Sequence, residues 1–162
     1  MAGVSVVVLI LFLFFIYLIL FAIFILSTLI NYIFESISVM CMSKSLGYKN
    51  NITSWIPFYN KYILGKISGN KIMGGISGGL TFILFFLSPY LYIYQEEKVI
   101  LYIILMIIAI TILILDIFIA HNIYIKSNDK YGDIFTIFNI LSLGLLRPIF
   151  LFVVRNKLSK SK

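Results

Sequence analysis

The chain has 162 residues, of which 62% are hydrophobic and 12% are charged, and its mean hydropathy is +1.09. A soluble domain is usually about half apolar and a quarter charged, so these values exclude a water-soluble core. The net charge of +7 lies in short segments beside apolar runs, where basic residues contact anionic lipid headgroups, so we expect no nucleic-acid partner. We therefore predict one membrane domain over residues 1–162. It is all-α and polytopic, with three to four transmembrane helices plus one interfacial or re-entrant helix.

The first apolar run covers residues 4–34. No Lys or Arg precedes Lys44, so the run lacks the basic region that opens a signal peptide, and we interpret it as a retained membrane helix. As a helix it is about 46 Å long, which exceeds the roughly 30 Å hydrocarbon layer, so it must tilt, kink or project. A more polar continuation begins at Glu35 and is predicted to end at Gly47, a residue typical of helix C-termini.

The stretch 54–67 reads SWIPFYNKYILGKI and is too short and too charged to span a bilayer comfortably. We predict an interfacial or re-entrant helix that begins near Pro57. Aromatic rings favour the headgroup layer, and lysines reach it by extending their side chains. The predicted partner surface consists of Trp55, Pro57, Phe58, Tyr59, Asn60, Lys61, Tyr62 and Lys66.

Three further apolar segments follow, at about 72–94, 99–124 and 134–154. Pro89 is predicted to kink the first of these segments. The second is the clearest membrane span, although it contains Asp116. The third is broken by Arg147 and Pro148, so the sequence leaves open whether it crosses the membrane or re-enters.

The distribution of basic residues favours re-entry of the last segment. If it does not cross, eleven of the thirteen Lys and Arg residues lie on one side and only Lys98 lies on the other, with Arg147 near or within the membrane. If it crosses, the two sides carry similar numbers of basic residues. Because cytoplasmic loops are rich in Lys and Arg, we predict three crossings and an amino terminus outside a bacterial cytoplasmic membrane.

Asp116 is the most informative single residue, because a carboxylate inside a membrane span is costly and must face protein or water. Asp116 and Arg147 are predicted at similar depths, so they form a candidate intramembrane ion pair. One interpretation is a proton- or ion-coupling carboxylate. The other, which we favour from the sequence because proton relays usually use several groups, is a structural salt bridge that holds the last half-helix.

We predict no catalytic site, metal site or cofactor. A Ser–Lys peptidase needs its nucleophile and base within hydrogen-bond reach on the outer surface, where Lys98 is the one predicted lysine. One histidine, His121, and one cysteine, Cys41, cannot complete a metal site. No glycine-rich phosphate loop is present, since residues 69–79 lack the G-K-[ST] pattern.

The central stretch resembles a family of small uncharacterised bacterial multi-pass membrane proteins. The similarity rests on a K-x-x-G turn, Lys44 to Gly47, followed by W-I-P-F-Y-N-x-Y-x-L-x-K-I-x-G from Trp55 to Gly69. Some members of that family are labelled signal-peptidase-like, and the family has no established function. This chain lacks the family's tryptophan-rich G-K-P-W-W sequence after the motif. The resemblance implies bacterial origin and a multi-pass architecture.

Three functions are compatible with these patterns. The first is a non-enzymatic partner subunit or membrane-organising factor that uses the cytoplasmic aromatic-basic surface of residues 54–67. The second is a transporter or channel component that uses Asp116 and Arg147. The third is an immunity protein against a membrane-active bacteriocin. The expected partners are the bilayer, with anionic headgroups on the cytoplasmic side, and a membrane protein or a second copy of the chain.

Overall fold

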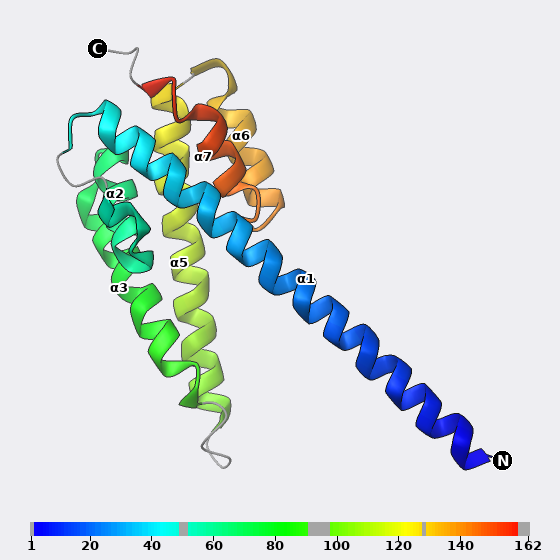
Figure 1. Cartoon of the computed structure of the whole chain (residues 1–162). Coiled ribbons are helices and arrows are strands. Elements are labelled where there is room, and N and C mark those ends of the chain that lie inside the picture. The colour runs from blue at the N-terminus through cyan, green and yellow to red at the C-terminus, as the bar shows by residue number, and fades with distance from the viewer. Residues whose placement is uncertain (1, 49–51, 91–97, 128, 159–162) are drawn as a thin grey trace. The chain divides into compact units, whose positions relative to one another are not determined.

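The structure is a computed structural model that describes residues 2–48, 52–90, 98–127 and 129–158. These residues form six α-helices and one 3₁₀-helix and contain no strand, which confirms the all-α prediction for the described chain (Figure 1). The elements are α1 (Ala2–Ser45), η1 (Ile52–Trp55), α2 (Pro57–Ser68), α3 (Lys71–Leu87), α5 (Lys98–Ser127), α6 (Asp129–Leu141) and α7 (Arg147–Val154). Two helical stretches are long and apolar enough to cross a membrane, Val7–Ser45 and Val99–Ser127.

The chain divides into two compact units, Met1–Ile33 and Phe34–Lys162. The first unit is the amino-terminal part of α1. Its side chains from Val7 to Ile30 are all exposed, and most of them are large and apolar. An apolar helix that buries none of these side chains has the character of a segment solvated by lipid. The helix continues without a break past residue 34, where the apolar run ends, as far as Ser45.

The second unit begins with the polar end of α1. Glu35 and Val39 are buried there, together with three serines, Ser36, Ser38 and Ser43. The helix ends as predicted at Gly47, which has a φ of +77°. The amide of Gly47 donates to the Lys44 carbonyl, and that of Tyr48 donates to the Ser43 carbonyl. This hydrogen-bond pair is a Schellman motif, which favours glycine at the left-handed position.

Helices α2 and α3 form a close hairpin that depends on small residues. Pro57 is the first residue of α2, as predicted, and Gly69 ends this helix with a φ of +93°. Asn70 then caps α3 by accepting a hydrogen bond from the Met73 amide. A Cβ atom on Gly74 would lie 2.6 Å from the Lys61 carbonyl oxygen, so a larger residue at position 74 cannot be accommodated without a shift.

The predicted span at 72–94 corresponds to α3, which ends at Leu87. Ser88 and Pro89 form a turn and Tyr90 is helical again, so the regular helix is interrupted at the proline. Residues 91–97, including the predicted end of the span, lie outside the described residues.

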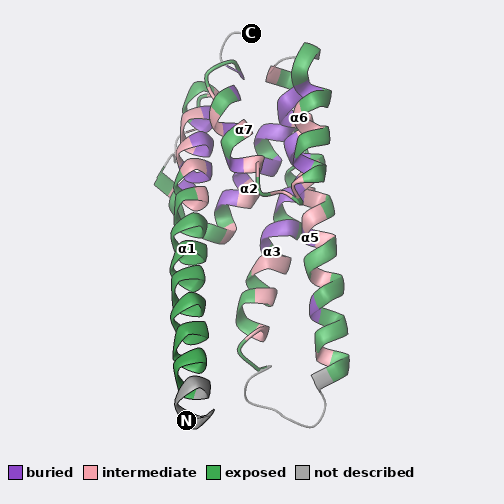
Figure 2. Ribbon diagram, turned by 90° about the vertical axis from the view of Figure 1, so that its right-hand side faces the viewer, coloured by how far each residue is buried: buried purple, intermediate pink, exposed green. Residues whose placement is uncertain are grey.

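The predicted span at 99–124 is α5, which contributes a large part of the buried core. Its carboxyl-terminal half packs against α2, α6 and α7, and Figure 2 shows the buried residues gathered in this part of the second unit. His121 Nδ1 lies 2.8 Å from Thr136 Oγ1 of α6, and Gly132 allows α6 to approach the α5 backbone closely. The core consists of Val39, Met42, Ile63, Leu64, Ile67, Ile119, Ala120, Ile123, Tyr124, Leu151, Val154 and Leu158.

The last apolar segment is a helical hairpin. With 13 and 8 residues, α6 and α7 are about 20 Å and 12 Å long, so each is shorter than the roughly 30 Å hydrocarbon layer. The turn between them places Leu143 and Gly144 at φ values of +51° and +84°. In Figure 1 α6 leads away from the end of α5, and α7 returns toward that same end.

Candidate functional site

Four charged side chains meet inside the second unit, each from a different helix. Asp116 of α5 accepts a hydrogen bond from Lys61 of α2, and the distance from Lys61 Nζ to Asp116 Oδ2 is 2.7 Å. The same oxygen contacts Arg147 Nη1 at the start of α7. The other oxygen, Oδ1, accepts a hydrogen bond of 2.6 Å from Ser77 Oγ of α3. The Asp116 carboxylate therefore links three further helices to α5.

Arg147 extends this group of contacts to α1. Its Nη2 atom donates to Glu35 Oε2 at 2.6 Å, while Nη1 faces Asp116. The planar guanidinium group presents several donors in a fixed geometry, so it can bridge two carboxylates that a single ammonium group would reach less well. We refer to Glu35, Lys61, Asp116 and Arg147 as the charge network.

The charge network is buried and electrically balanced. Its four side chains are only 11–13% exposed. Two carboxylates face one ammonium and one guanidinium group, so their formal charges cancel. Buried ions need partners of this kind because their desolvation costs several kcal/mol each. The network can therefore hold four helices in register without leaving a net charge inside the protein.

The structure brings Asp116 and Arg147 into contact, the pair that their predicted depths indicated. The prediction that all eight residues of the partner surface face outward is wrong for two of them. Lys61 binds Asp116, and Asn60 is only 2% exposed. Both residues lie on the face of α2 that packs into the unit, because this helix is covered by α3 and α5 as well as by η1.

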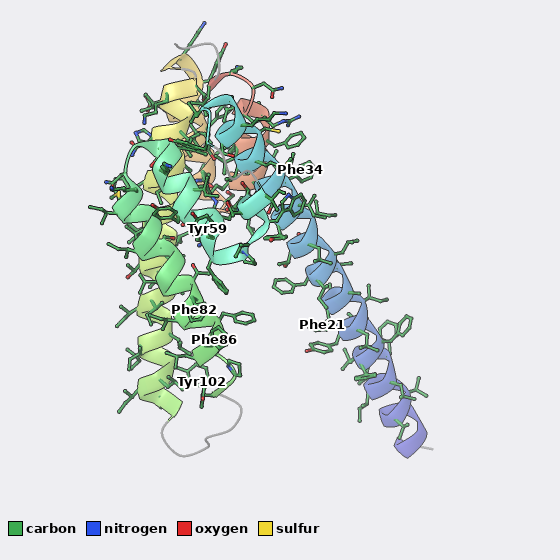
Figure 3. All side chains as sticks on the ribbon, turned by 60° about the vertical axis from the view of Figure 1, so that its left-hand side comes forward. Phe21, Phe34, Tyr59, Phe82, Phe86 and Tyr102 are labelled. Carbon is green, nitrogen blue, oxygen red and sulfur yellow. The ribbon has the colours of Figure 1, made fainter. Side chains whose placement is uncertain are left out.

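The remaining aromatic residues of this stretch form a partly exposed cluster. The rings of Tyr59 and Tyr62 lie 5.4 Å apart, and Phe58 packs edge-on against Phe82 of α3 with centroids 5.1 Å apart. Tyr59 and Phe82 are labelled in Figure 3. Trp55 is 39% exposed. The rings of Phe58, Tyr59, Tyr62 and Phe82 line an apolar groove of about 450 Å³, together with Ile56, Gly75, Gly78 and Gly79.

Lys66 is the exposed basic residue of α2. Its ammonium nitrogen lies 4.0 Å from the centre of the Tyr48 ring, a cation–π contact. A pocket of about 260 Å³ lies beside it and is also lined by Tyr59 and Tyr62. Pro57 is exposed at the start of the helix. The aromatic and basic character predicted for this stretch is therefore divided between the surface and the interior.

Sequence reasoning did not identify Glu35 and Ser77 as members of the site. Glu35 carried a usable signal, since it is the one acidic residue before Glu96 and follows a 31-residue apolar run. Ser77 carried none, because a single serine in a glycine-rich helix start has no distinguishing pattern.

A second groove reaches the charge network from one side. It has a volume of about 260 Å³ and runs between α5 and the α6–α7 turn. Its lining includes Asp116 and Arg147 along with Ala109, Ile112, Leu113, Ile117, Asn139, Leu143 and Gly144. We call it the Asn139 groove. On another side of Asp116, the side chains around Lys61, Leu64 and Leu151 leave no space for a water molecule.

Known proteins give no further information on this site. No protein-family model, curated protein or solved structure matches the chain. Among the described residues, no three His, Cys, Asp or Glu side chains come together in a way that could hold a metal ion. Interpretation of the charge network therefore depends on its own geometry and chemistry.

Proposed function

We propose that this chain is a small, non-enzymatic, multi-pass membrane protein of the transporter or channel class, with the Asn139 groove as its solute site. The observation that carries the proposal is a groove that reaches two charged side chains, Asp116 and Arg147, within an otherwise apolar group of helices. Charged residues at membrane depth commonly mark ion and solute pathways. Non-spanning helices commonly line such sites in transport proteins.

The proposed topology has α1, α3 and α5 as crossings and an external amino terminus. Lys44 and Lys66 lie in the last turns of α1 and α2, and Lys71 and Lys130 lie in the first turns of α3 and α6. These four helix ends lie toward the same side in Figure 1. Lys126 belongs to the same group, since its Nζ atom donates to the Ser68 carbonyl at the end of α2. An excess of Lys and Arg favours the cytoplasmic side of a bacterial membrane.

The helix lengths support re-entry of the segment after α5. The lengths of α6 and α7 suit a hairpin that enters the membrane and returns. The Asn139 groove then lies beneath the tip of this hairpin, beside the five α5 residues 109, 112, 113, 116 and 117. These positions recur at intervals of three and four, so they share one helix face. Asp116 lies eleven residues before the end of α5, or about 17 Å from it. The groove would open toward the external side.

The proposal requires water in the groove, which single cysteines can test. In a Cys41→Ser background, Ala109→Cys places a thiol in the groove, and Ile110→Cys places one on the exposed apolar surface of the same helix. Charged thiol reagents react with thiolates, which form in water and not in hydrocarbon. Intact cells are treated with a membrane-impermeant reagent. We expect Ala109→Cys to react at least tenfold faster than Ile110→Cys.

The comparison has two informative outcomes. Fast external labelling at position 109 alone would support an aqueous pathway to Asp116. Equal, slow labelling at both positions would mean that the groove is sealed, and the charge network would then have a structural role.

A partner-subunit role is the second candidate, favoured by the apolar groove beside Tyr59 and Tyr62. Gly75 and Gly79 on its floor are exposed, and a Cβ atom on Gly79 would meet nothing within 4 Å. Small residues four positions apart allow two membrane helices to approach closely. Dimer formation through the face of α3 predicts a disulfide-linked dimer of Gly79→Cys in membranes. Monomer alone under oxidising conditions would exclude this arrangement.

A further inference from the structure

Asn139 has an unusual environment. It is fully buried in α6, and neither its Oδ1 nor its Nδ2 atom has a hydrogen-bond partner among the described residues. Arg147 has a similar deficiency, because its Nε atom is buried without a partner although Nη1 and Nη2 are both engaged. Leaving a buried donor or acceptor unpaired is unfavourable, because the group has lost its hydrogen bonds to water. Both residues line the Asn139 groove.

These groups define a specific hydrogen-bonding requirement. Asn139 offers one acceptor oxygen and two N–H donors, and Arg147 Nε offers one N–H donor. A complementary group must therefore accept hydrogen bonds and also donate one. A carboxylate or a ketone can only accept, whereas an amide both accepts through its oxygen and donates through its nitrogen. An amide can form a cyclic pair of hydrogen bonds with the side chain of Asn139.

Charge and size restrict the ligand further. The charge network has no net formal charge, so the groove provides no overall attraction for an anion or a cation. Apolar side chains, including Ile112, Leu113 and Leu143, make up much of the lining. A volume of about 260 Å³ corresponds to roughly nine water molecules, which suits a small branched molecule or one end of a larger one.

We propose that the Asn139 groove binds a neutral molecule that carries a carboxamide next to a short apolar group, with Asn139 and Arg147 Nε recognising the amide. This inference rests on the proposed function, because it names the class of solute that the groove would admit. The binding site itself is testable without any measurement of transport.

Three ligands with the same branched carbon skeleton provide the test. Isovaleramide carries the amide, isovalerate carries a charged acceptor, and 4-methyl-2-pentanone carries a neutral acceptor. Binding to the full-length protein in lipid nanodiscs is measured by ligand-detected NMR, with empty nanodiscs as the reference for partitioning. Only the amide can donate a hydrogen bond to Asn139 Oδ1, which stays unpaired when either of the other two ligands binds, so we expect about tenfold tighter binding of isovaleramide than of isovalerate or 4-methyl-2-pentanone.

Two substitutions and a matched control locate the preference. Asn139→Leu should abolish the preference for the amide, so that the affinities for the three ligands lie within threefold of one another. Asn139→Asp keeps the size of the side chain but removes both N–H donors, and it should also weaken amide binding, so the test does not depend on one variant folding. Asn60→Leu is the control, since Asn60 is also buried with an unpaired Oδ1 atom but does not line the Asn139 groove.

The inference is overturned if the wild type binds all three ligands equally, which would indicate that water alone satisfies Asn139. It is also overturned if Asn139→Leu retains the amide preference. Failure of the proposed function is recognised separately. Amide binding without thiol labelling at Ala109→Cys would leave a binding site that has no aqueous pathway. Fast labelling of Ala109→Cys without a preference for the amide ligand would support the aqueous pathway and exclude amides as the ligand class.

Discussion

Removal of Arg147 tests whether the charge network acts as a unit. Arg147→Met keeps the length of the side chain but withdraws the cation that contacts both Glu35 and Asp116. Asp116 keeps Lys61 and Ser77, whereas Glu35 loses the one ion-pair partner that it has among the described residues. The variant therefore leaves a buried carboxylate without a compensating charge.

The expected loss follows from this imbalance. Removing one partner of a buried ion pair costs about 3–5 kcal/mol, while replacing both partners with uncharged residues of similar size is often nearly neutral. The second change, Glu35→Gln, restores the balance, because Asp116 and Lys61 remain as a matched pair. We expect Arg147→Met to lose about 3–5 kcal/mol of unfolding free energy, and the double variant to recover at least about 2 kcal/mol of it.

The unfolding free energy can be measured by SDS titration in mixed micelles, followed by far-ultraviolet circular dichroism. The matched control is Arg147→Met combined with Asp116→Asn, which leaves Glu35 and Lys61 without the partners that they contact. This control should recover less unfolding free energy than the double variant with Glu35→Gln. If the Glu35→Gln double variant is no more stable than Arg147→Met alone, the charges are screened by water and the network does not act as a buried unit.

Two further predictions concern topology and helix packing. In a Cys41→Ser background, intact cells are treated with an impermeant thiol reagent, and we expect Ala2→Cys to react and Lys157→Cys not to react. External labelling of Lys157→Cys would establish a fourth crossing and contradict the re-entrant hairpin. Gly74→Ala should lose about 1–3 kcal/mol because its Cβ atom would lie 2.6 Å from the α2 backbone. A Cβ atom on Gly79 of the same helix would meet open space, so Gly79→Ala should be neutral or up to about 1 kcal/mol more stable. SDS titration measures both variants, and equal losses of stability would exclude steric conflict as the cause.

Local chemistry explains the parts of the structure that could be predicted from the sequence. Uniform apolar runs determine where long helices form, so the predicted span at 99–124 matches α5 within a few residues. Gly47 ends α1 because a left-handed residue suits glycine, and Pro57 begins α2 because a proline at this position loses no helical hydrogen bond. These effects act within one helical turn, and no neighbouring helix is needed to produce them.

The orientation of the helices was beyond such reasoning. A helix that is apolar on all sides, such as α1 or α5, has no polar face that indicates which residues turn inward. The inward position of Lys61 could not be inferred from a stretch in which aromatic and basic residues alternate, and it was assigned to the surface. Its true partner, Asp116, lies 55 residues further along the chain.

The sequence by itself determined the helical class, most helix ends and the cost of placing Asp116 and Arg147 among apolar residues. The pairing of Asp116 with Arg147 was predicted from their depths, but only the tertiary structure decided that Glu35, Lys61 and Ser77 join them. Glu35 and Arg147 are 112 residues apart, and Ser77 is 39 residues from Asp116. The physical reason is that a buried charge must find its counter-charge through packing, whereas hydropathy and capping are satisfied by neighbouring residues in the chain. For the same reason, the unpaired amide of Asn139 emerged only once α6 was packed against α5.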